Sequence, residues 1–227
     1  MPEHVVRYGN VGRPPEPDGR LDAPAFHRNH EAIWSVLAGF LNGKLGDVLE
    51  AGSGTGQHVV AFARRTPDIT WWPSDYGERH IESIAAWRAH EGLANVRAPV
   101  RIDLAEQAWG LGEAEPVLPA KFLAIFCANV IHIAPWNVAE GLFAGAAPRL
   151  RPEGRLFLYG PFMRNGAHTA PSNEAFDLSL RSSNSEWGVR DMDDVRALAE
   201  RGGLRLVEVL DMPANNFILA FEHAGNS

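Results

Sequence analysis

A glycine-rich segment holds the residues whose types and spacing are best suited to bind a ligand. Residues 48–58 read Val-Leu-Glu-Ala-Gly-Ser-Gly-Thr-Gly-Gln-His, so an apolar run ends, glycines alternate with small residues, and a helix is expected to begin. Glycines permit a sharp turn and let the backbone approach a ligand closely. Many nucleotide-binding proteins carry such a loop, so the loop alone indicates only a nucleotide-like ligand.

Two residues distinguish this loop from the fingerprint loop of dinucleotide-binding proteins. Its glycines follow G-x-G-x-G, and Gln57 stands where G-x-G-x-x-G requires a glycine. Glu50 lies just before the glycines, where a carboxylate would repel a pyrophosphate but suits a ligand with an ammonium and a sulfonium group. A dehydrogenase that uses a nicotinamide cofactor is therefore disfavoured.

Aspartates follow the next two expected strands. Asp75 lies 19 residues after Gly56, and an acidic residue about 20 residues beyond such a loop can accept hydrogen bonds from ribose hydroxyls. Asp103 follows one strand later, where its side chain can reach an adenine amino group, and Tyr76 can stack on the adenine ring. Either aspartate alone could be a solvated residue at a strand end, but the ordered set of loop, Asp75 and Asp103 indicates a ligand site.

The elements that must position these residues alternate along the chain. A helix is expected over residues 24–41, where apolar residues recur at helical spacing and Gly43 can end the helix in a left-handed conformation. Alternation of strands and helices behind it predicts an α/β fold, with a mostly parallel sheet covered by helices on both faces. The strands are expected over 47–51, 69–73, 96–102, 122–127 and 155–160, and the helices over 57–65, 78–91 and 136–150.

The last elements break this alternation. Asp191 is expected to cap a helix that runs to about Arg201, and residues 204–210 and 217–222 read as strands joined by a short turn. Two strands so close in sequence must be antiparallel, because a parallel crossover needs a dozen or more residues. The sheet is therefore expected to end in a hairpin.

Composition and charge limit the class of protein and its partners. Of 227 residues, 45% are hydrophobic and 22% are charged, as in a soluble globular protein. Residues 1–21 are expected to form an extended arm before a single domain over 22–227. The net charge of -7 and the lack of a lysine and arginine cluster weigh against a nucleic-acid partner. No apolar stretch approaches the roughly 20 residues of a membrane span and no signal core is present, so we expect a cytoplasmic protein without a membrane partner.

Cysteine and histidine give no sign of a disulfide or a metal site. The single cysteine, Cys127, excludes an intrachain disulfide, and its apolar surroundings predict a buried side chain. The nine histidines show no metal-ligand spacing, and His27 and His30 on one expected helix are too few for zinc. We therefore expect no metal.

The sequence resembles the class I S-adenosylmethionine-dependent methyltransferases from about residue 28 to residue 222. More narrowly, it resembles an uncharacterised family that includes methyltransferase-like protein 26 and its bacterial relatives. The strings that carry this resemblance are residues 28–29, 49–58, 73–75, 126–136, 159–162, 168–169, 171–173, 187–191 and 212–216. One departure is local, since Tyr76-Gly77 stands where the family often has Asp-Leu.

The resemblance implies a fold and a cofactor, but no particular substrate. The fold is Rossmann-like, with a mostly parallel seven-stranded sheet that ends in an antiparallel hairpin, and the cofactor is S-adenosyl-L-methionine. The residues expected to bind this cofactor are Glu50, Gly52, Ser53, Gly54, Thr55, Gly56, His58, Asp75, Tyr76, Asp103, Leu104, Asn129 and Val130.

The methyl acceptor is expected at segments that leave the strand ends, because ligands gather at the carboxyl ends of strands in an open α/β sheet. His132 is the one side chain there that could act as a general base near neutral pH; alternatively, it hydrogen-bonds a loop carbonyl and orders the site. The expected acceptor-binding residues are Arg28, Asn29, His132, Trp136, Tyr159, Phe162, Ser172, Asn173, Asn215 and Asn216.

The segment after the fourth expected strand limits the classes of methyl acceptor. Methyltransferases that act on amino groups of adenine or glutamine commonly carry an Asn/Asp-Pro-Pro-aromatic string there, whereas this chain has Asn129-Val130-Ile131-His132. We therefore expect methyl transfer to a small-molecule oxygen, nitrogen or sulfur acceptor. The alternative, of another class, is a non-catalytic S-adenosylmethionine-binding regulator or scaffold. The sequence predicts no oligomeric state.

Overall fold

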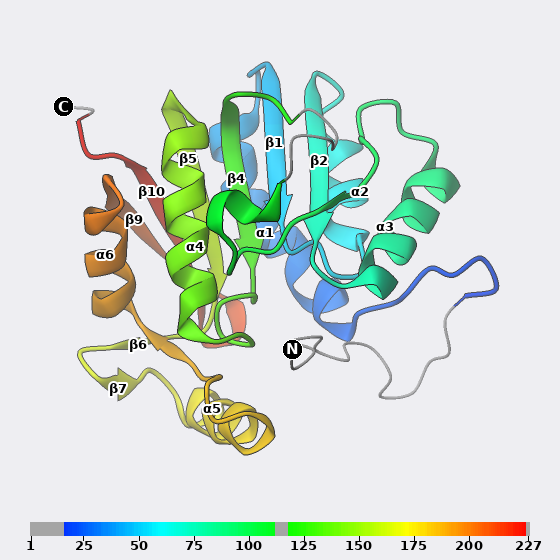
Figure 1. Ribbon diagram of the computed structural model, residues 1–227. Helices are drawn as coiled ribbons and strands as arrows, with labels where there is room; N and C mark the ends of the chain where they lie inside the picture. Colours follow the sequence, from blue (N-terminus) through cyan, green and yellow to red (C-terminus); the bar gives the residue numbers. More distant parts are fainter. Residues whose placement is uncertain (1–15, 112–117, 226–227) are drawn as a thin grey trace. The chain divides into compact units, whose positions relative to one another are not determined.

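The computed structural model describes residues 16–111 and 118–225 (Figure 1). Its main sheet has seven strands in the order β3-β2-β1-β4-β5-β10-β9, and a smaller sheet has the order β7-β6-β8. The chain divides by its contacts into two compact units. Unit 1 comprises the described residues up to Asp103 together with those of Leu111–Phe126, and unit 2 comprises Leu104–Gly110 and the described residues from Cys127 onward.

Unit 1 contains the glycine-rich loop and the strands beside it. β1 pairs in parallel with β2 and with β4, so Glu50 lies opposite Pro73 on one side and Phe126 on the other. The ends of these parallel strands therefore meet at the loop. The elements of this part of the chain are α1 (Pro24–Leu41), β1 (Gly46–Ala51), α2 (Gln57–Ala63), β2 (Ile69–Asp75), α3 (Glu78–Glu91), β3 (Val100–Arg101) and β4 (Phe122–Ala128), whose last two residues belong to unit 2.

Two helices of unit 1 have the predicted bounds because local signals end them. α1 spans Pro24–Leu41, and Gly43 follows with a φ of 73°. α3 spans Glu78–Glu91, and Gly92, with a φ of 64°, donates its N–H to the carbonyl of Arg88 at 3.0 Å. Glycine adopts these left-handed conformations without a Cβ clash.

The core of unit 1 fixes α1 and α2 on the strands. Phe62 of α2 lies 6.0 Å from Trp71 and 5.9 Å from Phe126 between ring centroids, and 5.7 Å from Trp34 of α1. The apolar stripe of α1, which includes Ile33, is buried against this cluster. Burial of such large aromatic rings provides much of the hydrophobic stabilisation of a small unit.

The prediction of a strand over 96–102 is wrong in its extent. Only Val100–Arg101 forms β3, and Val96 makes a single bridge with Trp71. Around this bridge the N–H of Trp71 donates to the carbonyl of Asn95 at 2.7 Å, and the N–H of Arg97 donates to the carbonyl of Trp71 at 2.9 Å, so the pairing is interrupted only between Arg97 and Val100. In addition, the proline at position 99 has no N–H to donate.

Unit 2 contains the hairpin that ends the main sheet. The elements are η1 (Gln107–Gly110), α4 (Trp136–Ala146), η2 (Ala147–Arg149), β5 (Leu150–Gly160), β6 (Phe162–Arg164), β7 (Ala167–His168), α5 (Pro171–Ser183), β8 (Arg190–Asp191), α6 (Met192–Arg201), β9 (Leu204–Met212), η3 (Pro213–Asn215) and β10 (Asn216–His223). β10 pairs antiparallel with both β5 and β9, as expected for the hairpin. Asp191 caps α6 by accepting the N–H of Asp193 at 2.8 Å, which confirms the predicted cap.

Two predictions in unit 2 need correction. The helix expected to reach residue 150 ends at Ala146, because Pro148 supports a short 3-10 turn and lacks the N–H of a continuing α-helix, and β5 begins at Leu150 rather than at 155. The polar stretch at 168–173 leads into α5, with Pro171 at the first helical position.

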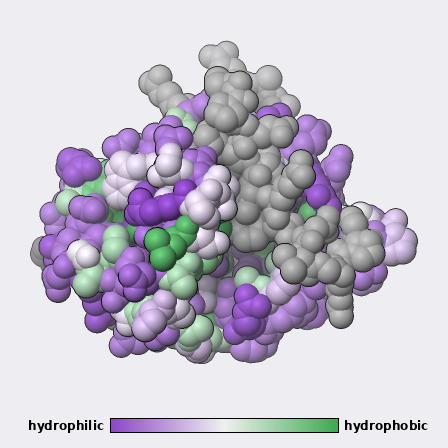
Figure 2. All heavy atoms as spheres, turned by 90° about the horizontal axis from the view of Figure 1, so that it is seen from below, coloured by the Kyte–Doolittle hydropathy of each residue, from purple (hydrophilic) through white to green (hydrophobic). Residues whose placement is uncertain are grey.

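On the face seen in Figure 2, the described residues are mainly hydrophilic. Figure 2 shows purple, hydrophilic side chains with small green patches between them. The large apolar side chains that stay exposed are Leu45, Phe176, Leu178 and Val209. In the described parts of the chain, no helix combines the length and the apolar character needed to cross a bilayer.

Candidate functional site

The glycine-rich loop of unit 1 has backbone conformations that residues other than glycine rarely adopt. Gly52, Gly54 and Gly56 have φ values of 77°, 55° and 89°. A Cβ on Gly56 would lie 2.9 Å from the Cα of Ile84 in α3, so the loop and α3 approach too closely for any side chain there. A Cβ on Gly54 would have nothing within 4 Å. Gly54 therefore leaves open space that a ligand can approach.

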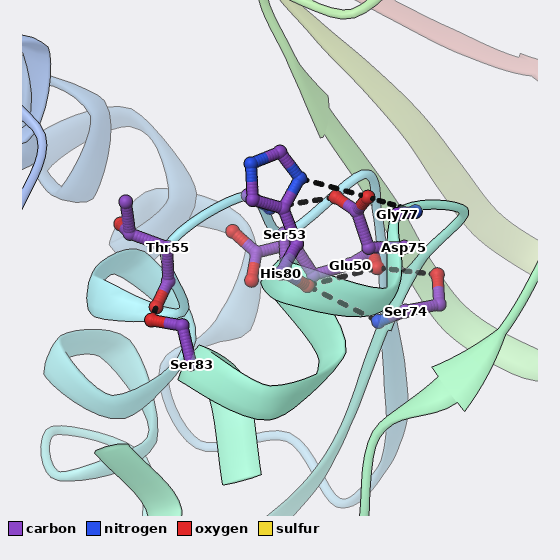
Figure 3. Close-up of polar contacts among 9 residues, drawn as sticks. Glu50, Ser53, Thr55, Ser74, Asp75, Gly77, His80 and Ser83 are labelled. Carbon is purple, nitrogen blue, oxygen red and sulfur yellow. Dashed lines mark hydrogen bonds and ion pairs between the residues drawn. The ribbon is translucent and has the colours of Figure 1, made fainter. Parts of the chain in front are cut away.

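Asp75 connects the end of β2 to this loop (Figure 3). Its Oδ2 accepts the N–H of Gly54 at 2.9 Å, and its Oδ1 accepts the N–H of Gly77 at 2.9 Å. The Nδ1 atom of His80 lies 3.0 Å from the same Oδ1. These contacts hold the Asp75 side chain in place. Because each carboxylate oxygen can accept more than one hydrogen bond, Oδ2 can still accept one from a further donor.

Glu50 is a buried carboxyl at the end of β1. Its side chain is 1% exposed, and its Oε2 has no hydrogen-bond partner among the described residues. Burial, with a contribution from the negative charge of Asp75, raises the pKa of Glu50 to about 8. The carboxyl is therefore mainly protonated at neutral pH, and a cationic group beside it would favour the carboxylate.

Gln57 ties the loop to the start of the described chain, a role that its position in the motif did not indicate. Its Oε1 accepts the N–H of Ala23 at 2.7 Å and the hydroxyl of Thr55 at 2.9 Å, and its Nε2 donates to Asp22 at 2.8 Å. Ser83 adds a second connection, since its hydroxyl accepts the N–H of Leu21 and donates to the carbonyl of Thr55. Residues 21–23, which we call the strap, are thus fixed to the loop and to α3.

Asn29 and His58 lie together, whereas Arg28 does not join them. The Nε2 of His58 lies 2.9 Å from the Oδ1 of Asn29, so a neutral ring protonated on Nε2 donates to the amide. Burial of the ring, with a contribution from His30, lowers the pKa of His58. Arg28 is exposed on α1. The structure therefore pairs one expected acceptor residue with one expected cofactor residue.

The two residues expected near adenine lie beside Asp75. The backbone N–H of Ile102 donates to the carbonyl of Asp75 at 3.1 Å, which places Asp103 directly after this contact. Tyr76 follows β2, and the guanidinium carbon of Arg101 lies 5.3 Å from the centre of its ring. Leu104 is buried in unit 2, where its carbonyl faces Gly141 of α4.

His132 of unit 2 is enclosed. Its side chain is 1% exposed, and neither ring nitrogen has a partner among the described residues. The ring contacts Phe162 edge-on at 4.9 Å, and a Cβ on Gly160 would lie 2.3 Å from Nε2. Burial lowers the pKa of His132 to about 3; the charge of Arg190 adds to this effect and that of Asp177 opposes it. The imidazole is therefore neutral.

The segment before His132 is shaped by Asn129. Asn129 has a φ of 59°, and its N–H donates to the carbonyl of Tyr159 at 2.8 Å. Tyr159 and Phe162 are buried, and Val130 is half-buried. Trp136 is half-buried at the start of α4. Unit 2 thus brings together Asn129, His132, Tyr159 and Phe162 at the ends of β4 and β5.

The expected acceptor residues near the end of the chain also meet. Asn173 at the start of α5 donates to the carbonyl of Asn215 at 2.9 Å, and the amide of Asn215 lies 3.4 Å from the hydroxyl of Ser172. Asn216 donates to the carbonyl of Pro213 at 3.1 Å and so satisfies the hairpin turn. The start of α5 and the hairpin turn therefore support each other.

Comparison with known proteins identifies the family. A family model described as "Protein of unknown function (DUF938)" matches residues 20–223. The chain belongs to this family.

The fold of this DUF938 member is that of S-adenosylmethionine-dependent methyltransferases. Similar solved structures include an O-methyltransferase family protein from Burkholderia thailandensis (TM-score 0.72, 16% identity), CalO1, a methyltransferase in calicheamicin biosynthesis, in an SAH-bound form (0.65, 14%), and the mitomycin 7-O-methyltransferase MmcR (0.66, 19%). In the same order, the matches cover 89%, 87% and 88% of this chain. They cover 58%, 55% and 56% of the length of the three similar proteins. The DUF938 member thus spans little more than half of their length, and at these identities the likeness shows the fold alone.

The loop of this DUF938 member has groups that fit S-adenosylmethionine. The unpartnered Oε2 of Glu50 can accept from an ammonium group, Asp75 can accept from ribose hydroxyls, and Gly54 leaves space beside both. A pyrophosphate would instead meet two carboxyl groups. The residues of unit 1 are therefore chemically suited to a cationic nucleoside.

Proposed function

We propose that this chain binds S-adenosyl-L-methionine through the loop that begins at Glu50 and through Asp75. The observation that carries the proposal is the buried Glu50 carboxyl, whose Oε2 has no partner among the described residues. An unpaired buried polar atom costs free energy, which a ligand donor would recover. When bound, the cofactor supplies a methyl group already activated on a sulfonium.

The residues of the chain have distinct roles in this proposal. Glu50 accepts from the ammonium group, Asp75 accepts from the ribose hydroxyls, and Gly54 allows close approach of the backbone. Tyr76 and Asp103 contact the adenine. The further proposed cofactor residues are Gly52, Ser53, Thr55, Gly56, His58, Leu104, Asn129 and Val130.

We propose that the methyl acceptor is a small molecule with an oxygen, nitrogen or sulfur nucleophile. A displacement at an activated methyl group needs mainly alignment of the reactants and exclusion of water. The proposed acceptor residues are Arg28, Asn29, His132, Trp136, Tyr159, Phe162, Ser172, Asn173, Asn215 and Asn216, and His132 is the proposed base. Residues 22–227 are proposed to be one cytoplasmic methyltransferase domain, related to methyltransferase-like protein 26.

A non-catalytic S-adenosylmethionine-binding protein is the second candidate. The enclosure of His132 favours it, because a neutral imidazole with a pKa of about 3 is a weak base. Methyl release from labelled cofactor in a metabolite extract separates the two candidates: turnover supports the enzyme, and cofactor binding without turnover supports the regulator.

Calorimetry with S-adenosylhomocysteine and with NAD tests the cofactor proposal. We expect the first ligand to bind and the second to show no heat. Asp75→Ala should weaken binding by about tenfold or more, since a lost hydrogen bond to a charged group costs about 1.5–3 kcal/mol. Asp68→Ala, a change in an exposed aspartate before β2, is the matched control and should leave the affinity unchanged.

The opposite pattern would overturn the proposal. Tight binding of NAD without binding of S-adenosylhomocysteine contradicts the cofactor. An unchanged dissociation constant in Asp75→Ala, with a lowered melting temperature, assigns Asp75 to holding the loop through Gly54 and Gly77 instead of to binding.

A further inference from the structure

Unit 2 contains a hollow, and Trp136 is the only one of its lining residues that the methyl-transfer proposal uses. Its volume is about 400 Å³, which lies in the range of small-ligand pockets. It is bounded by the start of α4, the end of α5, β8 and α6. The lining residues are Trp136, Arg181, Val189, Arg190, Asp191, Asp194, Ala197 and Arg201.

Hydrogen-bond donors exceed acceptors in this hollow. Three of its lining residues are arginines, and each guanidinium offers five N–H donors in a rigid fork. Arg181 uses its Nε on Asp177 at 2.9 Å, and Arg201 has no hydrogen bond or ion pair among the described residues. Most of these donors therefore face no protein acceptor in the described parts of the chain.

Arg190 carries a charge that no bonded carboxylate balances. Its Nε donates to the carbonyl of Ile131 at 3.0 Å, and its Nη2 donates to the carbonyls of Ala134 at 2.6 Å and Glu186 at 2.8 Å. Carbonyl groups orient a guanidinium but do not neutralise it. Burial lowers the pKa of Arg190, so a counter-anion would stabilise its charged form. Its Nη1 has no described partner.

The carboxylates of the hollow offset these arginines only in part. Asp191 accepts the N–H of Gly166 at 2.6 Å on Oδ2 and the N–H of Asp193 at 2.8 Å on Oδ1. Both of its oxygens thus serve the backbone. Asp194 has no described hydrogen bond and is the acidic group that a ligand anion would meet. The indole of Trp136, with the guanidinium carbon of Arg190 5.6 Å from its centre, adds a flat apolar wall.

We propose that this hollow binds a small organic anion, whose carboxylate or phosphate group pairs with Arg190 and Arg201 and whose apolar part lies on Trp136. Guanidinium groups bind both kinds of oxyanion through paired hydrogen bonds. The site shares no residue with the glycine-rich loop, and its proposed ligand does not depend on the proposed cofactor. It also assigns a role to residues 189–191, which the methyl-transfer proposal does not use.

Calorimetry on the full chain without cofactor tests the site. The probes are inorganic phosphate, benzoate and, as an uncharged analogue, benzyl alcohol, in buffer of low ionic strength. We expect phosphate or benzoate to bind and benzyl alcohol not to bind. Tighter binding of benzoate identifies a carboxylate ligand on Trp136, and tighter binding of phosphate identifies a phosphate ligand.

Three variants make the test specific. Arg201→Gln should weaken anion binding by about tenfold, as expected for loss of a charge-assisted hydrogen-bond pair. Arg196→Gln is the matched control, because Arg196 lies on the same helix but pairs with Asp193 at 2.8 Å and does not line the hollow. Asp194→Asn should tighten binding, because it removes a like charge from the wall.

Several results would overturn the proposal. The first is absence of binding by both phosphate and benzoate at millimolar concentration. The second is an equal loss of affinity in Arg201→Gln and Arg196→Gln, which would reflect only the overall charge of α6. The third is weaker anion binding in Asp194→Asn. Since the measurement contains no cofactor, failure of S-adenosylhomocysteine to bind elsewhere does not affect it.

Discussion

At the scale of single residues, His132 shows how burial changes the meaning of a histidine. The sequence places it beyond a buried strand, where a base would be useful, and the structure encloses it between Gly160 and Phe162. With a pKa of about 3, the ring stays neutral throughout the physiological range. A proton taken up by this ring would be held weakly.

Substitution of His132 separates a base from a packing group. If His132 is the base, His132→Gln should leave S-adenosylhomocysteine affinity unchanged and lower the rate by about 10²–10⁴-fold, the usual contribution of a positioned base. If it only orders the segment, affinity or thermal stability should fall instead, and the rate should follow occupancy. In either case the pH–rate profile should show no ionisation of His132 near pH 6.5; a His-dependent step there would contradict the observed burial.

At the scale of elements, two glycines of one loop should respond differently to alanine. Gly56→Ala places a Cβ 2.9 Å from Ile84 at a φ of 89°, so we expect a clear loss of thermal stability. Gly54→Ala adds only the strain of its φ of 55°, about 1–2 kcal/mol, because no atom lies within 4 Å of the new Cβ. Its main effect should be weaker cofactor binding.

Thermal denaturation and calorimetry on both variants check this contrast. The proposal requires that Gly54→Ala reduces S-adenosylhomocysteine affinity while most of the melting temperature is retained. If its affinity equals that of the unchanged chain, the ligand does not approach the loop at Gly54.

Elements whose ends depend on local chemistry could be predicted from the sequence, and those that depend on distant partners could not. The bounds of α1 and α3 follow from glycines just beyond them. The side-chain amide of Asn95, just before the bridge at Val96, reaches carbonyls that are 26 to 32 residues away, which no local pattern reveals. Likewise, Gln57 could be recognised as a departure from the dinucleotide fingerprint, but its contacts with the strap lie 34 and 35 residues away.

At the scale of the whole molecule, buried titratable groups give stability a predictable pH dependence. Glu50 has a pKa of about 8 in the folded chain against a usual 4.5, so the folded state retains a proton that the unfolded state loses. The contribution of Glu50 to the free energy of unfolding therefore falls between pH 4.5 and about 8. His132 acts in the opposite sense. Its pKa is about 3 against a usual 6.5, so its contribution is present above 6.5 and is lost as the pH falls.

Above pH 6.5, the rise in the free energy of unfolding due to His132 is complete and no longer opposes the fall due to Glu50. The free energy of unfolding should therefore fall between pH 6.5 and 8, by at most about 1.4 kcal/mol per pH unit from this group. Urea denaturation at several pH values measures the slope. Glu50→Gln should flatten it, whereas Glu82→Gln, a change in an exposed residue of α3, should not. An equal slope in Glu50→Gln would mean that Glu50 titrates normally.

The bonds of Gln57 to the strap also constrain how this lineage can change. A single substitution to glycine at position 57 would complete the spacing G-x-G-x-x-G, yet it would also leave the N–H of Ala23 and the carboxylate of Asp22 without their present partner. Such an intermediate would be less stable before it gained any new ligand. Evolution toward a dinucleotide cofactor would therefore require coordinated replacement of residues in the strap and in the loop, and natural variants should show correlated identities at positions 22 and 57.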